Sequence, residues 1–184
     1  MVHVEKLAAE YDIAVRWRAF PLHPEIPDEG LTIEELFAGR IVDVAAIEKR
    51  LQTVAYSLSL PLAVRLKTYN TRSGQELAKW AESCGKGDAF HRALFGAYFG
   101  EGRNIGKVDE LSIIVASAGL PTEEIKTILS ENRFASSVDE DWKASRSLGI
   151  TGVPTFVCGN RKTVGFQPYE SLARFVGECG AQPR

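Results

Sequence analysis

The chain has 184 residues, with 22 Lys and Arg against 24 Asp and Glu, so its formal net charge is −2. Hydrophobic residues make up 45% of it and charged residues 25%, which is typical of a globular domain and excludes a disordered tail or a disulfide-stapled miniprotein. Nucleic acids and anionic membranes bind clustered positive charge. The sequence has no Lys- or Arg-rich block, so we expect no nucleic-acid partner.

A membrane-spanning helix needs about 18 consecutive apolar residues. The longest apolar runs, Leu58–Leu66 and Leu111–Leu120, are shorter and are interrupted by Ser, Pro or Arg. Glu5, Glu10 and Asp12 lie where a secretory signal would have its apolar segment. We therefore expect no membrane partner and a cytoplasmic location.

The first 30 residues combine three kinds of local signal. Apolar residues recur every three or four positions between Val4 and Tyr11, which predicts a helix over residues 2–11. The alternating, β-branched and aromatic pattern of Val15–Phe20 predicts a strand. Residues 21–30 contain three prolines and a glycine, so they predict a loop.

The central part of the chain predicts a series of helices. Asp43 and Ser73 are each placed to cap the start of one. Apolar residues at helical spacing predict further helices over residues 89–99, 108–118, 122–131 and 137–148.

The last segment changes character again. Thr155–Cys158 and Arg161–Gly165 are strand-like, and Gly159-Asn160 between them suits a tight turn, so they predict a β-hairpin. Pro168 then fits the first turn of a closing amphipathic helix.

The three cysteines, Cys84, Cys158 and Cys179, lie far apart and form neither a CxxC motif nor a zinc-ligand pair. We expect reduced, buried thiols without a redox role, because none has a visible helix N-terminus or cationic neighbour that would lower its pKa. The three histidines also lack metal-ligand spacing. No metal is therefore expected.

The most informative local motif is Gly152-Val153-Pro154-Thr155-Phe156, in which a proline opens a strand directly after a helix. If the Val153-Pro154 bond is cis, the backbone N–H and C=O of Val153 stay outside the sheet and can bind an extended peptide or a small thiol compound by strand addition. The alternative is an ordinary trans proline at a strand start. Val153, Pro154 and Thr155 are the candidate substrate-binding residues.

Five segments of the chain, which include this motif, occur in the order typical of the DsbA-like thioredoxin family, and the chain resembles that family, in particular its FrnE-like branch. The resemblance covers about residue 4 to residue 176. The segments are VRWRAFPLHPEIPDEG, YNTRSGQELAKWAESCGK, AFHRALFGAYFGEGRNI, LSIIVASAGL and SLGITGVPTFVCGNRKTVGFQPYESLARF. In the second of them, Asn70 and Thr71 match a polar turn of the family, which we interpret as helix capping first and substrate contact second.

The resemblance implies an α/β thioredoxin fold with a large all-helical insertion. Residues 1–31 and 149–184 would form the thioredoxin-like domain, and residues 32–148 the inserted helical domain. Family members exchange thiols and disulfides through a CxxC at the start of the first helix. Residues 1–11 resemble the later turns of that helix, so the first strand is expected to be missing, with the CxxC upstream of Met1 and no catalytic residue within this chain.

Three functions remain open. The first is a thiol-disulfide oxidoreductase or disulfide isomerase, with a thiol- or disulfide-containing protein or small molecule as substrate and with this chain redox-inactive by itself. The second is a redox-inert module that binds a peptide or a partner. The third is a glutathione-dependent enzyme similar to kappa-class transferases and 2-hydroxychromene-2-carboxylate isomerases, in which a serine, also expected upstream, activates glutathione; no other cofactor is expected.

The expected loss of the first strand has a structural consequence. In a thioredoxin sheet this strand lies centrally, between Val15–Phe20 and Thr155–Cys158, so its loss leaves two strand edges unpaired. We expect either a strand donated by a partner chain, as in a homodimer, or a marginally stable monomer.

Overall fold

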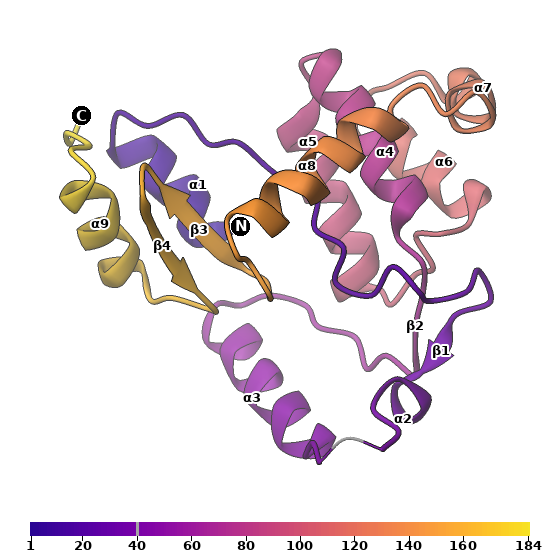
Figure 1. Cartoon of the computed structure of the whole chain (residues 1–184), viewed down its shortest axis with the longest axis horizontal. Helices are drawn as coiled ribbons and strands as arrows, with labels where there is room; N and C mark the ends of the chain where they lie inside the picture. Colours follow the sequence, from indigo (N-terminus) through magenta and orange to yellow (C-terminus); the bar gives the residue numbers. More distant parts are fainter. Residues whose placement is uncertain (40) are drawn as a thin grey trace. The chain divides into compact units, whose positions relative to one another are not determined.

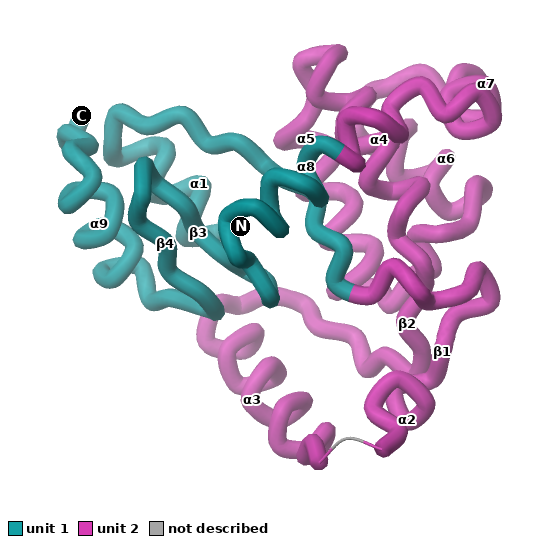
Figure 2. The backbone as a smooth tube through the Cα atoms, viewed as in Figure 1, with its two compact units in different colours: residues 1–22, 140–184 teal, residues 23–139 magenta. Residues whose placement is uncertain are grey.

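The computed structural model describes residues 1–39 and 41–184. The chain divides into two compact units, coloured separately in Figure 2. Unit 1 contains residues 1–22 and 140–184, and unit 2 contains residues 23–139. Each unit is continuous in space although unit 1 is assembled from both ends of the chain.

The unit boundaries fall at 22/23 and 139/140, whereas the boundaries drawn from the sequence are 31/32 and 148/149. The second unit boundary lies inside one helix, α8 (Ala135–Ser147). This helix therefore begins in unit 2 and ends in unit 1.

Besides the end of α8, unit 1 contains two helices and a hairpin (Figure 1): α1 (Val2–Glu10), β3 (Thr155–Cys158), β4 (Arg161–Val164) and α9 (Tyr169–Glu178). The predicted hairpin is confirmed, with antiparallel pairing from Thr155–Val164 to Cys158–Arg161. Its turn contains Gly159 at φ 59°, a left-handed conformation that glycine adopts without steric cost. Pro168 lies one position earlier than predicted, as the N-cap of α9.

The core of unit 1 joins its first helix to its last. Leu7 of α1 is buried with Leu172 and Val176 of α9, and Phe156 of β3 packs against this cluster. At the edge of the cluster the Tyr169 hydroxyl donates a hydrogen bond to the Glu10 carboxylate, which raises the pKa of Tyr169 to about 12. The hydrophobic contact and the polar contact thus tie α1 to α9.

The predicted strand Val15–Phe20 is wrong, because this segment forms no ladder with any described strand. It is held instead by one buried carboxylate on α8. Asp141, whose side chain is 1% exposed, accepts hydrogen bonds from Arg18 Nη1 at 2.5 Å and from the backbone N–H of Ala19 at 2.9 Å. A strand-like sequence becomes a strand only beside a partner strand, and within residues 1–39 and 41–184 β3 pairs with β4 alone.

Unit 2 is mostly helical. It contains, in chain order, β1 (Leu31–Thr32), α2 (Ile33–Leu36), α3 (Val44–Ser57), β2 (Lys67–Thr68), α4 (Arg72–Ser83), α5 (Gly87–Phe95), the π-helical turn η1 (Gly96–Gly100), α6 (Val108–Ser117), the 3-10 turn η2 (Thr122–Glu124) and α7 (Ile125–Ser130). The two-residue antiparallel pair β1–β2 was not predicted. It is too short to leave a periodic pattern in the sequence.

The core of unit 2 is an apolar cluster shared by α4, α5, α6 and α7. Leu77, Phe90, Leu111 and Ile125 are fully buried within it. Within each helix the buried apolar residues recur at helical spacing, so the sequence predicted the helices well although their ends shift by one to three residues.

The two predicted helix caps differ in outcome. Asp43 caps α3, since its Oδ1 accepts a hydrogen bond from the N–H of Ala46 at 2.9 Å. The prediction for Ser73 is wrong, because α4 already begins at Arg72 and leaves Ser73 inside its first turn. The N–H of Arg72 is bound by Asn70 instead.

A search of the described helices finds none that combines the length and the apolar character of a membrane span.

We predict that Arg18→Ala destabilises the protein by about 1–3 kcal/mol, because it removes a donor from the buried Asp141 carboxylate. The matched control is Arg16→Ala, an exposed position in the same extended segment, which should change the free energy of unfolding by less than about 0.5 kcal/mol. Urea denaturation of both variants measures the difference. Equal midpoints for the two variants would contradict the role of the Arg18–Asp141 pair.

Candidate functional site

The loop between α8 and β3 contains the predicted substrate-binding residues, and its start is fixed by a lysine. α8 ends at Ser147, and Gly149 turns the chain at φ 62°. Lys162 of β4 donates from Nζ to the carbonyl oxygens of Leu148, at 2.9 Å, and Gly149, at 3.4 Å. A cation here satisfies the free carbonyl groups at a helix C-terminus, so the loop leaves α8 in a defined direction.

The end of the loop is fixed by two further hydrogen bonds. The Val153-Pro154 peptide bond is cis. The carbonyl of Pro154 accepts from the N–H of Gly165 at 2.8 Å, and the hydroxyl of Thr155 donates to the carbonyl of Gly152 at 2.6 Å. Pro154 and Thr155 thus use their polar groups to hold the turn.

Val153 differs from its two neighbours. Val153 is 50% exposed. Within the described part of the chain, neither its backbone N–H nor its carbonyl makes a hydrogen bond. Val153 lies two residues before β3, and in the described part of the chain β3 pairs with β4 along one edge only. The geometry therefore leaves one donor and one acceptor, both on rigid backbone, open to an extended chain.

The three thiols do not gather at this loop. Cys84 is exposed, so the prediction that it is buried is wrong, and Cys158 and Cys179 are only partly buried. Cys158 lies at the far end of β3, about 13 Å from Pro154 at a rise of about 3.3 Å per residue. A side-chain interaction with Cys179 and burial raise the pKa of the Cys158 thiol, which disfavours the nucleophilic thiolate at neutral pH.

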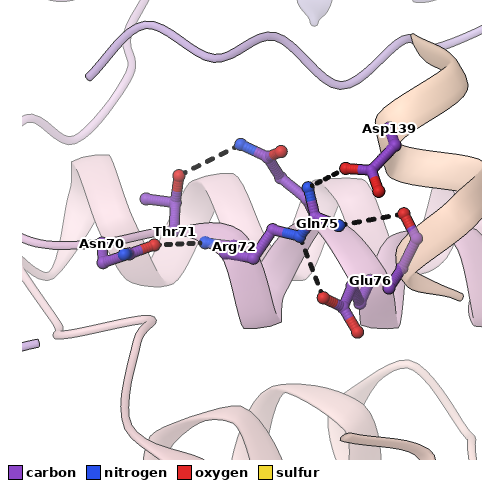
Figure 3. A network of polar contacts seen from close by, with 7 residues as sticks. Asn70, Thr71, Arg72, Gln75, Glu76 and Asp139 are labelled. Carbon is purple, nitrogen blue, oxygen red and sulfur yellow. Dashed lines mark hydrogen bonds and ion pairs between the residues drawn. The ribbon is translucent and has the colours of Figure 1, made fainter. Parts of the chain in front are cut away.

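A second cluster of polar residues lies in unit 2, at the start of α4 (Figure 3). Arg72 is its centre: Nε donates to Glu76 at 3.0 Å, Nη1 to Asp139 at 2.8 Å and Nη2 to the carbonyl of Ala135 at 2.9 Å. Glu76 is only 5% exposed, so its charge is stabilised chiefly by this guanidinium. The cluster joins α4 to the first turns of α8.

Asn70 and Thr71 belong to the same cluster. Asn70 Oδ1 accepts from the N–H of Arg72 at 2.9 Å, and its Nδ2 donates to the carbonyl of Ile26 at 3.1 Å. Thr71 accepts a hydrogen bond from the side chain of Gln75 at 3.2 Å. The predicted capping role is confirmed for Asn70, whereas Thr71 is the N-cap residue without a capping bond from its side chain.

A cavity of about 270 Å³ adjoins this cluster. Three of its polar lining residues, Asn70, Arg72 and Glu76, are already bonded to one another. No group of three or more potential metal ligands occurs among the residues described. We therefore assign the cluster a structural role and keep the loop around Val153 as the candidate binding site.

The comparisons with known proteins agree with this architecture. The DSBA-like thioredoxin domain family matches residues 2–177. The uncharacterized protein YwbO of Bacillus subtilis (strain 168) is 26% identical over 150 residues, which cover 81% of this chain and 74% of YwbO.

Two solved structures share the fold. The probable DsbA oxidoreductase SCO1869 from Streptomyces coelicolor superposes with a TM-score of 0.87 at 24% identity, covering 97% of this chain and 81% of that one. A 2-hydroxychromene-2-carboxylate isomerase superposes with a TM-score of 0.73 at 20% identity, covering 96% and 85%. At these identities the likeness concerns the fold.

The hairpin, the loop that precedes it and the inserted helices define a thioredoxin-fold protein with a helical insertion, as predicted from the sequence. The chain belongs to the DSBA-like thioredoxin domain family.

We predict that Arg72→Ala lowers the free energy of unfolding by about 3 kcal/mol, because it leaves the buried Glu76 carboxylate without its partner. The control is Arg133→Ala, which breaks a pair with Glu131 in which both side chains are about half exposed and should cost at most about 1 kcal/mol. Thermal or urea unfolding distinguishes the two. Similar losses would show that the cluster does not anchor α4.

Proposed function

We propose that this chain is the substrate-binding part of a thiol-disulfide oxidoreductase or disulfide isomerase of the FrnE-like branch. The observation that carries the proposal is the pair of open hydrogen-bonding groups on Val153, at the start of β3. Membership in the DSBA-like family supports thiol and disulfide compounds as the class of substrate.

The loop would bind its substrate by strand addition. An extended peptide that runs along the start of β3 can accept a hydrogen bond from the N–H of Val153 and donate one to its carbonyl. Because Pro154 and Thr155 fix the turn from both sides, the backbone of Val153 is ordered before the substrate arrives. Such preorganisation reduces the entropy lost on binding and would hold a substrate sulfur at a defined place.

The attacking thiol would come from residues outside this chain. Cys158 has a raised pKa and lies at the opposite end of β3. The open edge of β3 can accept one more strand. We propose that this strand carries the CxxC and is supplied either by an adjoining segment of a longer polypeptide or by a second copy in a homodimer.

Glutathione is a competing ligand for the same groups, because it is itself a short peptide with a thiol. Structural likeness to a 2-hydroxychromene-2-carboxylate isomerase makes this comparison worth testing. A glutathione-dependent enzyme would use the backbone of Val153 in the same way, but would bind glutathione in preference to a larger disulfide peptide.

We predict that Val153→Pro weakens binding of a disulfide-containing peptide roughly fivefold or more, since it removes a backbone N–H worth about 1 kcal/mol. Val153→Ala is the matched control, because it keeps the N–H and should bind like the unchanged chain. Amide NMR titration with the peptide, and separately with glutathione, gives each Kd. Circular dichroism checks that both variants are folded.

Equal affinities of the folded Pro and Ala variants would overturn the role of Val153. Binding of glutathione alone would favour the glutathione-dependent alternative.

We also predict that the chain of 184 residues does not accelerate reduction of insulin by dithiothreitol. Cys158 has a raised pKa and lies at the opposite end of β3 from Val153, Cys179 lies beside Cys158, and Cys84 belongs to the other unit. Insulin turbidity measures this. Turnover that disappears in a variant of Cys84, Cys158 or Cys179 would place the nucleophile within the chain and refute this part of the proposal.

A further inference from the structure

Two of the three cysteines are in contact in unit 1. Cys158 is the last residue of β3, and Cys179 is the residue that ends α9. The Sγ of Cys179 lies 3.6 Å from the carbonyl oxygen of Cys158 and donates a hydrogen bond to it. Interaction with the side chain of Cys179 and burial raise the pKa of Cys158. The sequence separates these residues by 21 positions, and the fold brings the sulfur of Cys179 against the backbone of Cys158.

An ion pair beside the two cysteines links the hairpin to the end of α9. Arg161 is the cross-strand partner of Cys158 in the hairpin. It donates from Nη1 to Glu178, which directly precedes Cys179, at 2.6 Å. A polar contact between the cross-strand partner of Cys158 and the residue before Cys179 thus links the end of α9 to the hairpin. The fold of unit 1 therefore holds Cys179 next to Cys158.

Cys84 provides a natural comparison. It lies at the end of α4 in unit 2, is exposed, and has the hydroxyl of Ser83 at 4.0 Å as its side-chain neighbour. Neither of the other cysteines belongs to that unit. Cys84 can react with small molecules but has no partner thiol within its unit.

We propose that Cys158 and Cys179 are an oxidisable pair that forms an intramolecular disulfide when the chain meets a small-molecule disulfide. This pair is separate from the site at Val153 and does not depend on the proposed function. One thiolate attacks the external disulfide, forms a mixed disulfide and releases one small thiol. The second thiolate then displaces the other small thiol, so the pair loses two protons and two electrons and the external disulfide ends as two thiols.

The cross-link would join the end of β3 to the end of α9 and so fix the helix that carries the core residues Leu172 and Val176. A disulfide restricts the unfolded chain. We therefore expect the oxidised form to melt roughly 5–10 °C above the reduced form. Because the pKa of Cys158 is raised, oxidation should become faster as the pH rises from neutral.

The test uses Cys84→Ser, in which only the pair remains, treated with oxidised glutathione and then alkylated. We expect a product lighter than the reduced chain by two hydrogen atoms and without bound glutathione. Trypsin should then release residues 147–161 joined to residues 175–184, because cleavage after Arg146, Arg161 and Arg174 isolates each cysteine in its own peptide.

Cys84→Ser/Cys179→Ser is the matched control, and it should form only a mixed disulfide with glutathione at Cys158. The proposal is overturned if folded Cys84→Ser accumulates glutathione adducts or disulfide-linked dimers in place of the internal link. It is also overturned if the linked peptides appear only after denaturation, because the fold would then not supply the proximity.

Discussion

The hydrogen-bonding requirement of β3 governs the arrangement of unit 1. The N–H and C=O groups along a strand edge need hydrogen-bond partners, and β3 is paired with β4 along one edge only in the part of the chain that the structure describes. The same constraint explains why Val15–Phe20 stays extended without becoming a strand. Both β3 and Val15–Phe20 could pair with a further strand. We propose that the segment with the reactive cysteines supplies that strand.

The two ends of β3 carry different chemistry. At its start, Val153 offers backbone groups, and the surrounding turn is fixed by Thr155 and Lys162. At its end, Cys158 meets the thiol of Cys179. A rigid hairpin that positions functional groups in the adjoining loops is a common division of labour in folds. Here the separation along β3 keeps the thiol pair away from the proposed binding site.

Local patterns in the sequence were sufficient for the helices, the hairpin and the Asp43 cap, because helical periodicity and turn chemistry act over a few residues. They were insufficient where the structure depends on distant partners. Ser73 looked like a cap, but Asn70 binds the N–H of Arg72 through its Oδ1 instead. The Nδ2 of Asn70 donates to the carbonyl of the distant Ile26, which orients the side chain. The pair between Arg72 and Asp139 spans 67 positions and leaves no local signal.

The same dependence on distant partners applies to the loop around Val153 and to the pair of Cys158 and Cys179. The motif around Val153 and Pro154 was visible from the sequence because the order of helix, proline and strand is local and family-specific. The availability of its backbone groups was predicted only on the condition of a cis Val153-Pro154 bond, and the sequence left the isomer open. The proximity of Cys158 and Cys179 was hidden, because it arises only when α9 packs against the hairpin. Substrate binding through the backbone and chemistry through a thiol therefore need not reside in one segment: the fold can supply the first while another strand supplies the second.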